Sequence, residues 1–443
     1  MAGEDEVSFP VPKSKARQLL SVFFVVALVT GFSFCLFYFN SLGSYVSRCP
    51  TYSNGASTEV RTEHEDLHGC ASYIRLPGMP LDAKSKNLEQ GKCDIFSGSW
   101  ISDRSGPVYT NNSCSFIHPH QNCMSNGRPD KEYLYWRWKP YGCNLSAFDS
   151  FKFLSSMRDK SWAFIGDSVI RNHIQSMLCH LSKVEEPVEI YHDEPYQCRT
   201  WYFVNHNFTL AMIWAPLLVK AENLQDAKLE IQLHLDMLEE KWTAQYCKYD
   251  FVIFSGGQWF LRKMVLWKDN AIVGCHNCED SSIKELGIEY PYRKVLQLTY
   301  QFMTSSEHKP LVFFRTWTPD HFEYGEWYSG GICNRTRPYD EGQYTGKPVD
   351  HVMRLVELEE FEKATAMAEE GGARLKLLDT LHLSLLRPDG HPGAYRTLDP
   401  FGEGKSTAKV QNDCVHWCLP GPIDTWDELI MKMLVDEGEI SYS

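Results

Sequence analysis

The sequence predicts an α/β fold in which a mostly parallel sheet is covered by helices on both faces, giving three layers, with a small disulfide-held lobe on its N-terminal side. Five apolar runs indicate buried strands, because they lack the alternation of polar and apolar residues that marks a half-exposed strand. Helical stretches separate several of them, a pattern typical of parallel sheets. The runs are WAFIGDS (162–168), FTLAMIWAP (208–216), YDFVIFSGG (249–257), KPLVFFRTW (309–317) and ARLKLLDT (373–380), and the helical stretches are Val169–Leu181, Leu224–Lys241, Tyr292–Thr304 and Val349–Glu370.

Length and composition agree with a large globular protein. The chain has 443 residues, of which 43% are hydrophobic and 23% charged, so it can bury a large core. Its net charge of −13 argues against a nucleic-acid partner, because such a partner selects for a basic surface. A neutral substrate is compatible with this charge.

The N-terminal region predicts a membrane anchor. Residues 19–39, LLSVFFVVALVTGFSFCLFYF, carry no charge and are long enough to cross a bilayer as a helix. Lys13, Lys15 and Arg17 precede the run, which favours a cytoplasmic tail at 1–18. A cleaved signal peptide is the alternative, but the run is too long and no small-residue cleavage site follows it. We therefore expect a single-pass type II protein with a luminal stem at 40–91.

Cysteines and glycosylation sequons point to the same compartment. Of 15 cysteines, Cys35 lies in the apolar run and the others follow it, a density that suits disulfides in an oxidising lumen. Asn-x-Ser/Thr sequons support a luminal position for the rest of the chain. They lie at Asn111, Asn144, Asn207 and Asn334.

Amino-acid composition divides the luminal part that follows the stem into two regions. Residues 92–145 hold Cys93, Cys114, Cys123 and Cys143 among Gly, Asn, Ser and aromatic residues, with few long apolar runs. This composition predicts a loop-rich subdomain held by disulfides rather than by its own core. Residues 146–443 carry the α/β pattern and form the predicted catalytic domain.

Ser168 is the first candidate catalytic residue. It lies on the sharp turn between the first strand and its helix, where helix-opening N–H groups and the positive end of the helix dipole suit a developing oxyanion. In a parallel sheet this edge, beyond the carboxyl ends of the strands, is where active sites form. Gly257 and Arg315 lie just past other strand ends. An ordinary helix cap is the simpler explanation of Gly-Asp-Ser alone.

A candidate base for Ser168 lies near the C-terminus. Asp413 and His416 are three residues apart, a spacing that places both side chains on one side of a turn. The carboxylate can then bind one imidazole nitrogen and leave the other free to take the serine proton. Cys414 and Cys418 lie in the same segment and can hold it in place through disulfides. An Asp-x-x-His pair also arises by chance, so the pair alone does not decide the matter.

Five segments in order resemble the plant trichome birefringence-like family of polysaccharide O-acetyltransferases, which are GDSL/SGNH esterase-like. The resemblance runs from Lys92 to Ile430 and implies a catalytic Ser168–His416–Asp413 set on a three-layer SGNH/GDSL-like fold. The segments are KCDIFSGSWISD (92–103), YLYWRWKPYGCNL (133–145), FIGDSVIRN (164–172), FRTWTPDHFEYGEWYSGGIC (314–333) and LRPDGHPGAY (386–395), followed by DCVHWC (413–418).

The resemblance implies a two-step reaction. Ser168 takes an acetyl group from a donor, such as acetyl-CoA or a membrane-supplied carrier, and a sugar hydroxyl then removes it, with His416 as base in both steps. No bound cofactor or metal is expected. The N–H groups of Ser168 and Gly257 would form the oxyanion hole. Arg171 and Asn172 match family residues that serve either structure or substrate orientation.

In one block the chain departs from the family. Many members carry Asn-Thr-Gly-His-Trp where this chain has Ser-Gly-Gly-Gln-Trp. Ser255 and Gln258 therefore differ from the family residues, and no third oxyanion donor can be assigned.

The resemblance also implies four disulfides. Two of them would tie the Asp413–His416 segment to the Cys-rich lobe and to the central sheet. The pairs are Cys93–Cys143, Cys114–Cys179, Cys123–Cys418 and Cys333–Cys414.

Three further signals have simple explanations. Cys275 and Cys278 have zinc-ligand spacing, but a local disulfide is favoured in an oxidising lumen, and no second Cys-x-x-Cys completes a zinc set. The acid-rich stretch Glu357–Glu370 is expected to be a solvated helix face. Most tryptophans should be packing residues, although one or two could stack on sugar rings. Those near the expected site are Trp259, Trp267, Trp317 and Trp327.

Three functions remain compatible with the sequence. The favoured one is a Golgi O-acetyltransferase acting on a hemicellulose, xyloglucan or mannan rather than xylan, because CHNC followed by ELGIEYPYRK (285–294) resembles that branch of the family. An acetylesterase would use the same residues with water as acceptor. A wall-polymer binding protein with a vestigial site would not need to keep Ser168, Asp413 and His416 together.

Overall fold

The structure is a computed structural model of the chain, and it describes residues 93–226, 228–402 and 410–441. All of these residues fall within one compact unit, Glu65–Ser443. The expected tail, anchor and stem (1–18, 19–39 and 40–91) lie outside the described residues, so these assignments stay predictions. Within the described part of the chain, no helix is both long and apolar enough to cross a membrane.

The main sheet has seven strands, and the five that the sequence predicts form its continuous parallel part. Two further strands extend one edge through antiparallel pairings, β5 with β6 and β4 with β5, so the sheet is mostly rather than wholly parallel. From one edge to the other the strands are β13 (Arg374–Leu378), β12 (Leu311–Arg315), β9 (Phe251–Phe254), β3 (Ser161–Gly166), β6 (Phe208–Trp214), β5 (Arg199–Phe203) and β4 (Val188–His192).

Burial on both faces explains why these apolar runs form the centre of the sheet. Every residue of β9 and β12 is buried, as is every residue of β3 after Ser161. The register pairs Ile165 with Phe254 and Gly166 with Trp214, so the carboxyl ends of β3, β9 and β6 are level. The loops that leave these strands therefore meet at one edge of the sheet.

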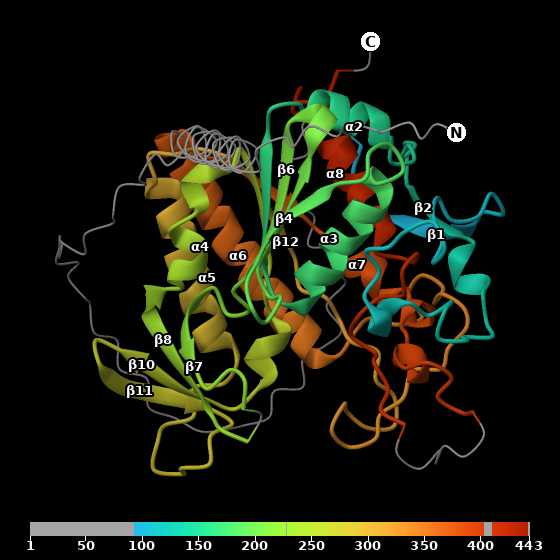
Figure 1. Ribbon diagram of the computed structural model, residues 1–443. Coiled ribbons are helices and arrows are strands. Elements are labelled where there is room, and N and C mark those ends of the chain that lie inside the picture. Colours follow the sequence, from blue (N-terminus) through green and yellow to red (C-terminus); the bar gives the residue numbers. More distant parts are fainter. Residues whose placement is uncertain (1–92, 227, 403–409, 442–443) are drawn as a thin grey trace, which may run out of the picture. The chain divides into compact units, whose positions relative to one another are not determined.

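Helices cover both faces of the main sheet, which gives the three expected layers. In Figure 1, α3 and α8 lie on one side of the sheet, and α5 and α6 lie on the other. The α-helices are α2 (Ser150–Ser156), α3 (Ser168–Leu181), α4 (Glu240–Thr243), α5 (Glu289–Ser305), α6 (Pro348–Gly371), α7 (Leu381–Leu385) and α8 (Asp424–Asp436). The short 3-10 helices are η1 (Pro119–Gln121), η2 (Glu132–Leu134), η3 (Val204–His206), η4 (Tyr246–Lys248), η5 (Gln258–Leu261), η6 (Pro388–Gly390) and η7 (Ala394–Arg396).

A second, four-stranded sheet corrects one sequence-based prediction. The helix expected over Leu224–Lys241 is wrong, because residues 231–238 form a strand and only a single helical turn follows. Helix-forming Leu, Glu and Lys residues suggested a helix, but apolar residues alternate from Ile231 to Leu235, and two neighbouring strands supply the backbone partners. In order the strands are β11 (Ala271–His276), β10 (Met264–Lys268), β8 (Ile231–Leu238) and β7 (Val219–Glu222).

The Cys-rich lobe packs on the main domain rather than around a core of its own. Its hairpin pairs β1 (Gly98–Ser102) with β2 (Trp136–Pro140). Trp100 and Trp138 are buried in the same hydrophobic cluster as the main sheet, and the Trp100 indole N–H donates to the Leu383 carbonyl at 2.9 Å. The lobe is thus loop-rich and dependent on its contacts, as its composition indicates.

The structure has disulfides at all four expected pairs, Cys93–Cys143, Cys114–Cys179, Cys123–Cys418 and Cys333–Cys414. Among the sequon residues, Asn144, Asn207 and Asn334 are exposed and Asn111 is half-buried. All four are therefore accessible, and their glycosylation stays a prediction.

Candidate active site

Ser168 lies where β3 turns into α3, two residues after the strand ends. The turn depends on Gly166, which has a φ of +153°, and a Cβ there would lie 2.1 Å from the Ser255 carbonyl oxygen. Only glycine accepts this close approach without displacing the backbone. The ends of β3 and β9 are thereby held together, and Ser168 and Gly257 follow these two ends.

Asp167 accepts hydrogen bonds from N–H groups at the start of α3 that the sequence analysis assigned to an oxyanion. Its Oδ1 accepts from the N–H groups of Val169 at 2.9 Å and Ile170 at 3.4 Å, so these donors cap the helix and are not free. Burial raises the pKa of Asp167, and the charge of Arg315 opposes that rise. Among the first three N–H groups of α3, that of Ser168 remains for a ligand.

Asp413 and His416 are in direct contact. The His416 Nδ1 lies 2.9 Å and 3.1 Å from the two carboxylate oxygens of Asp413, and the His416 and Val415 backbone N–H groups donate to the same carboxylate. Burial would raise the pKa of Asp413, but the charge of His416 and these hydrogen bonds lower it below its usual range. A proton on Nδ1 leaves Nε2 as the basic nitrogen. Nε2 is buried and has no hydrogen-bond partner among the described residues, Ser168 included.

The Asp413–His416 segment is fixed from several sides. Cys414 is bonded to Cys333, and Cys418 to Cys123. The backbones of Asp413 and Gly393 exchange two hydrogen bonds of 2.9 and 3.0 Å. A base held in this way keeps the geometry that proton transfer requires.

Asn172 links the serine helix directly to the histidine segment. Its side chain accepts from the Trp417 N–H at 2.7 Å and donates to the Trp417 carbonyl at 3.3 Å. Asn172 is on α3, one turn after Ser168, and Trp417 follows His416. The structure thus gives Asn172 a structural role and brings Ser168 and His416 to the same end of α3.

Gly257, the second expected oxyanion donor, is the third residue after β9 ends. A Cβ at this position would lie 2.5 Å from Cε3 of Trp317, so the tryptophan ring packs directly on the glycine. The Gln258 side chain, one of the departures from the family pattern, donates to the Thr318 carbonyl at 2.7 Å. Gln258 therefore holds the β9 and β12 loops together.

Comparison with known proteins assigns the chain to a family. Residues 145–433 match the family described as "GDSL/SGNH-like Acyl-Esterase family found in Pmr5 and Cas1p", and residues 91–144 match the "PMR5 N terminal Domain". Protein trichome birefringence-like 26 of Arabidopsis thaliana is 53% identical over 367 residues, covering 83% of this chain and 82% of that protein. The chain belongs to this GDSL/SGNH-like family, among its trichome birefringence-like members.

Two further relatives carry an activity in their names. Xyloglucan O-acetyltransferase 1 of Arabidopsis thaliana is 38% identical over 422 residues, covering 95% of this chain and 96% of that protein. Xyloglucan O-acetyltransferase 1 of Populus trichocarpa is 40% identical over 353 residues, covering 78% and 82%. The similarity extends through both the Cys-rich lobe and the α/β domain.

Two histidines of the Cys-rich lobe, His118 and His120, lie at the site but were not predicted from the sequence. Burial, together with the charges of Arg171, His120 and His416, lowers the pKa of His118 to about 4. Burial also lowers the pKa of His120, with His416 and Arg171 among its charged neighbours. The Cys123–Cys418 pair could have indicated this, since His-Pro-His-Gln-Asn precedes Cys123. Arg171 stays a candidate for substrate orientation.

The acid-rich stretch Glu357–Glu370 is not wholly a solvated face, which corrects a second prediction. Glu357 and Glu360 are buried. Glu357 accepts from the Tyr292 hydroxyl at 2.5 Å and from the Trp317 N–H at 2.8 Å, and the Tyr292 hydroxyl lies 3.2 Å from the Gly256 carbonyl. Glu357 thus supports the loop that carries Gly257. Local sequence showed only a run of acids, whereas burial depends on α5.

The Glu357 carboxyl predicts a pH-dependent stability. Burial raises its pKa from 4.5 to about 8, so the folded chain keeps a proton that the unfolded chain releases above about pH 4.5. Stability linked to this group is therefore lost as pH rises from about 4.5 to 8, by about 1.4 kcal/mol per pH unit. Between pH 6.5 and 8 we expect Glu357→Gln to gain about 2 kcal/mol relative to wild type, measured by denaturant unfolding.

Glu362→Gln is the matched control, because Glu362 is an exposed acid on the same helix. Its stability difference from wild type should not change with pH. An equal response of the two variants would show that Glu357 ionises normally in the folded protein.

Two of the remaining sequence signals are resolved by contacts. Cys275 and Cys278 form a disulfide, which leaves no thiolate for a metal at either position. Trp317 is fully buried, and the half-buried Trp267 donates its N–H to Gln232. Trp327, by contrast, is exposed.

Proposed function

We propose that this chain transfers acetyl groups to hydroxyls of a neutral cell-wall hemicellulose, xyloglucan or mannan rather than xylan. The observation that carries the proposal is the Asp413–His416 pair, in which His416 Nε2 makes no hydrogen bond with the described residues. Asn172 binds the backbone of the next residue, Trp417, and so joins this segment to the helix that begins at Ser168. The names of the xyloglucan O-acetyltransferases support the substrate class. The acid-rich composition agrees with a neutral acceptor.

The first step forms an acetyl-serine. The Ser168 oxygen attacks the acetyl carbonyl carbon while its proton moves to His416 Nε2, and the carbonyl oxygen gains the negative charge. The N–H groups of Ser168 and Gly257 stabilise that charge. When the carbonyl re-forms, the bond to the donor breaks, and the leaving group takes the proton from His416.

The second step repeats this chemistry with a sugar. A hydroxyl of the acceptor attacks the acetyl-serine, and His416 removes the hydroxyl proton. Collapse of the tetrahedral intermediate breaks the bond to Ser168, which recovers its proton from His416. The acetyl group ends as an ester on the sugar, and the enzyme returns to its starting state.

We infer that the reaction takes place in the Golgi lumen, with the chain anchored as a single-pass type II membrane protein. The apolar run at 19–39, the cysteine content and the sequons support this location. The acetyl donor is an ester or thioester, either acetyl-CoA or a membrane-supplied acetyl carrier. Neither requires a bound cofactor.

The acetyl-serine can be detected directly. Incubation of the full chain with 4-nitrophenyl acetate should add one acetyl group, mapped by mass spectrometry to the peptide that contains Gly166–Ser168. Addition of xyloglucan or mannan oligosaccharides should discharge the adduct and acetylate the sugar, whereas xylan oligosaccharides should do so more slowly. The Ser168→Ala variant should form no adduct.

The same experiment separates the alternatives. The family description names an acyl-esterase, and an esterase would lose the adduct to water at the same rate with or without sugar. A vestigial site in a binding protein would form no adduct and transfer nothing. Transfer without any adduct would replace the two-step mechanism with direct transfer.

A further inference from the structure

A short hairpin is attached at both of its ends to Cys414, in the segment that carries His416. The His321 N–H donates to the Cys414 carbonyl at 3.0 Å, and Cys333 forms a disulfide with Cys414. The intervening residues, 322–332, therefore leave the fold and return to it two residues from His416. We call residues 321–333 the site hairpin.

The site hairpin is held by its own hydrogen bonds. Glu323 and Ile332 exchange backbone hydrogen bonds of 2.8 and 2.9 Å, and the Gly331 N–H donates to the Glu326 carbonyl at 2.9 Å. At the tip, the Glu326 N–H donates to the Ser329 hydroxyl at 2.8 Å. These contacts fix the conformation of the tip.

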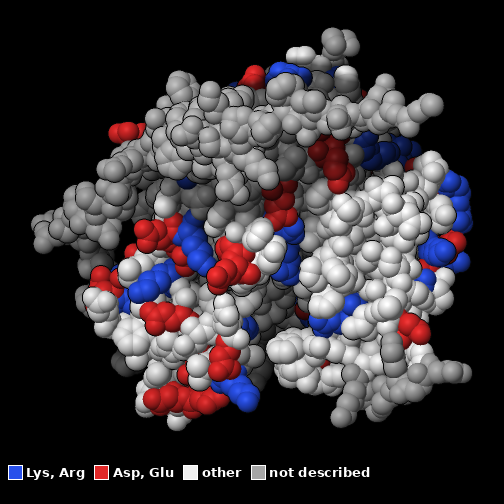
Figure 2. Space-filling view, viewed as in Figure 1, with Lys and Arg blue, Asp and Glu red and all other residues white. Residues whose placement is uncertain are grey.

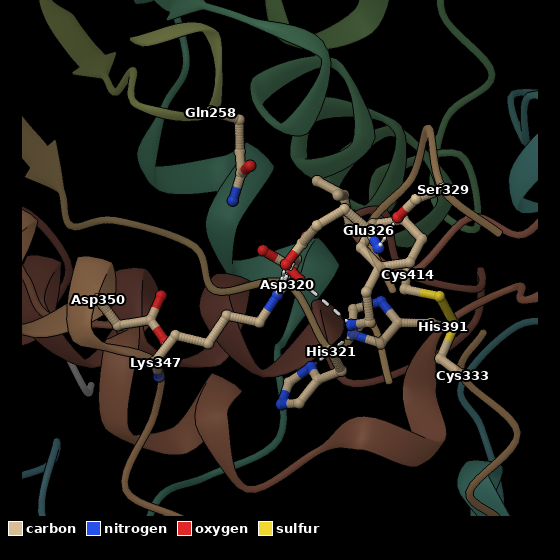
Figure 3. A network of polar contacts seen from close by, with 12 residues as sticks. Gln258, Asp320, His321, Glu326, Ser329, Cys333, Lys347, Asp350, His391 and Cys414 are labelled. Carbon is tan, nitrogen blue, oxygen red and sulfur yellow. Dashed lines mark hydrogen bonds and ion pairs between the residues drawn. A yellow bond between two sulfur atoms is a disulfide. The ribbon is translucent and has the colours of Figure 1, made fainter. Parts of the chain in front are cut away.

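A lysine outside the site hairpin forms ion pairs with the residue before the hairpin and with a residue at its tip. The Lys347 ammonium lies 2.6 Å from Asp320 and 3.3 Å from Glu326. Figure 3 shows this lysine beside both carboxylates and the Cys333–Cys414 disulfide close to His391. The hairpin thus presents a pre-formed surface.

Three large aromatic side chains project from this held hairpin. Tyr324 is 88% exposed, Tyr328 72% and Trp327 56%. The rings of Trp327 and Tyr328 meet edge to face at 5.5 Å. Tyr324 has a φ of +60°, a left-handed conformation that is costly for a tyrosine and is retained mainly at functional positions. Clustered exposed aromatic residues mark binding sites rather than ordinary surface.

The charges around these rings are neutralised. Glu323 pairs with Arg335 at 2.6 Å, and Glu326 pairs with Lys347. Figure 2 shows few charged side chains over the loops that Figure 1 draws in orange and red, in contrast to the charged surface over α5, β10 and β11. An aromatic surface with paired charges suits a neutral partner that offers flat apolar faces, as sugar rings do.

We propose that Tyr324, Trp327 and Tyr328 form a binding platform on which sugar rings of the polysaccharide acceptor stack. This inference rests on the proposed function. The platform holds a stretch of the polymer beside the segment of His416, so that one of its hydroxyls reaches the acetyl-serine. It recognises a neutral sugar chain through ring stacking rather than through charge.

The test measures polysaccharide binding without catalysis. De-acetylated xyloglucan and mannan oligosaccharides are titrated by calorimetry into full-length Ser168→Ala protein. The same titrations are made with a variant that also carries Trp327→Ala and Tyr328→Ala. We expect the dissociation constant to rise at least about tenfold with the two alanines. Trp327→Phe, which keeps an aromatic face, should retain most of the affinity. In the active enzyme the alanine variants should raise KM for the oligosaccharide more than they lower kcat.

Phe151→Ala is the matched control. Phe151 is an exposed aromatic residue on α2, which contacts the opposite end of α3 through the 2.8 Å bond from the Ser150 hydroxyl to the His180 carbonyl. Its removal should change neither binding nor transfer.

Two outcomes would overturn the platform. One is unchanged binding after both alanine substitutions, and the other is a Ser168→Ala protein that binds none of the oligosaccharides. If wild type transfers acetyl groups while the alanine variants bind normally, the platform fails and the proposed function stands. If the sugars bind through the aromatic residues but wild type transfers nothing, the proposed function fails and the platform stands.

Discussion

Replacement of Ser168 by alanine is expected to lower kcat for acetyl transfer by at least about 10⁴-fold, because the variant has no oxygen to carry the acetyl group. Any hydrolysis of the donor should fall equally, since both reactions pass through the same acetyl-serine. Initial rates with 4-nitrophenyl acetate, with and without oligosaccharide, measure both losses.

The fold should survive this change. The Ser168 hydroxyl makes no hydrogen bond within the described residues, and Asp167 rather than Ser168 caps α3. The midpoint of thermal unfolding should therefore stay close to that of wild type. Ser182→Ala is the matched control, because Ser182 ends the same helix and its hydroxyl donates to the Cys179 carbonyl, away from the site. Activity of Ser168→Ala within tenfold of wild type would show that another group carries the acetyl.

His416→Ala is expected to cost as much as Ser168→Ala, because the serine is a weak nucleophile until a base removes its proton. Asp413→Asn should cost about 10²- to 10⁴-fold, since the amide can no longer hold the Nδ1 proton and the tautomer is lost. The double variant Ser168→Ala with His416→Ala should be no slower than either single variant, because such residues act as a unit. Single-turnover kinetics with a generic acetyl ester measure each loss.

The chain contains a matched control for this pair. Glu189 and His192 are also three residues apart and in contact at 3.0 Å, but they lie on β4, away from Ser168 in sequence and strand order. His192→Ala should leave the rate unchanged. If Asp413→Asn also left the rate unchanged, another residue would have to orient His416, and the Asp-x-x-His interpretation would fail.

The parallel part of the sheet could be predicted because it depends on a local property. The central strands β3, β9 and β12 are buried on both faces, so they appear in the sequence as apolar runs. The edge strand β13 is less buried and contains Arg374 and Lys376. The strand at Ile231–Leu238 could not be predicted with the same ease. Flanking Leu, Glu and Lys residues within 224–241 favour a helix on propensity, whereas the alternation of apolar residues inside the strand and its pairing with β7 and β10 favour the strand.

The residues of the site divide in the same way. Ser168, Asp413 and His416 were found because each lies in a short motif whose geometry is local, a strand-to-helix turn and an i, i+3 pair. The motifs gain their specificity from the resemblance to a family. His118 and Glu357 were missed as site residues, because neither belongs to a motif of this kind and each reaches the site from another part of the chain.

The sequence by itself determined the apolar strands, the turn that carries Ser168 and the pairing of Asp413 with His416. These depend on periodicity and on contacts within a few residues. Only the tertiary structure decided that Asn172 joins the serine helix to Trp417, and that the site hairpin, anchored at Cys414, exposes its aromatic residues. Asn172 and Trp417 meet across 245 positions, and the hairpin returns to Cys414 across 81. Such contacts are selected by the packing of whole layers, which no local pattern records.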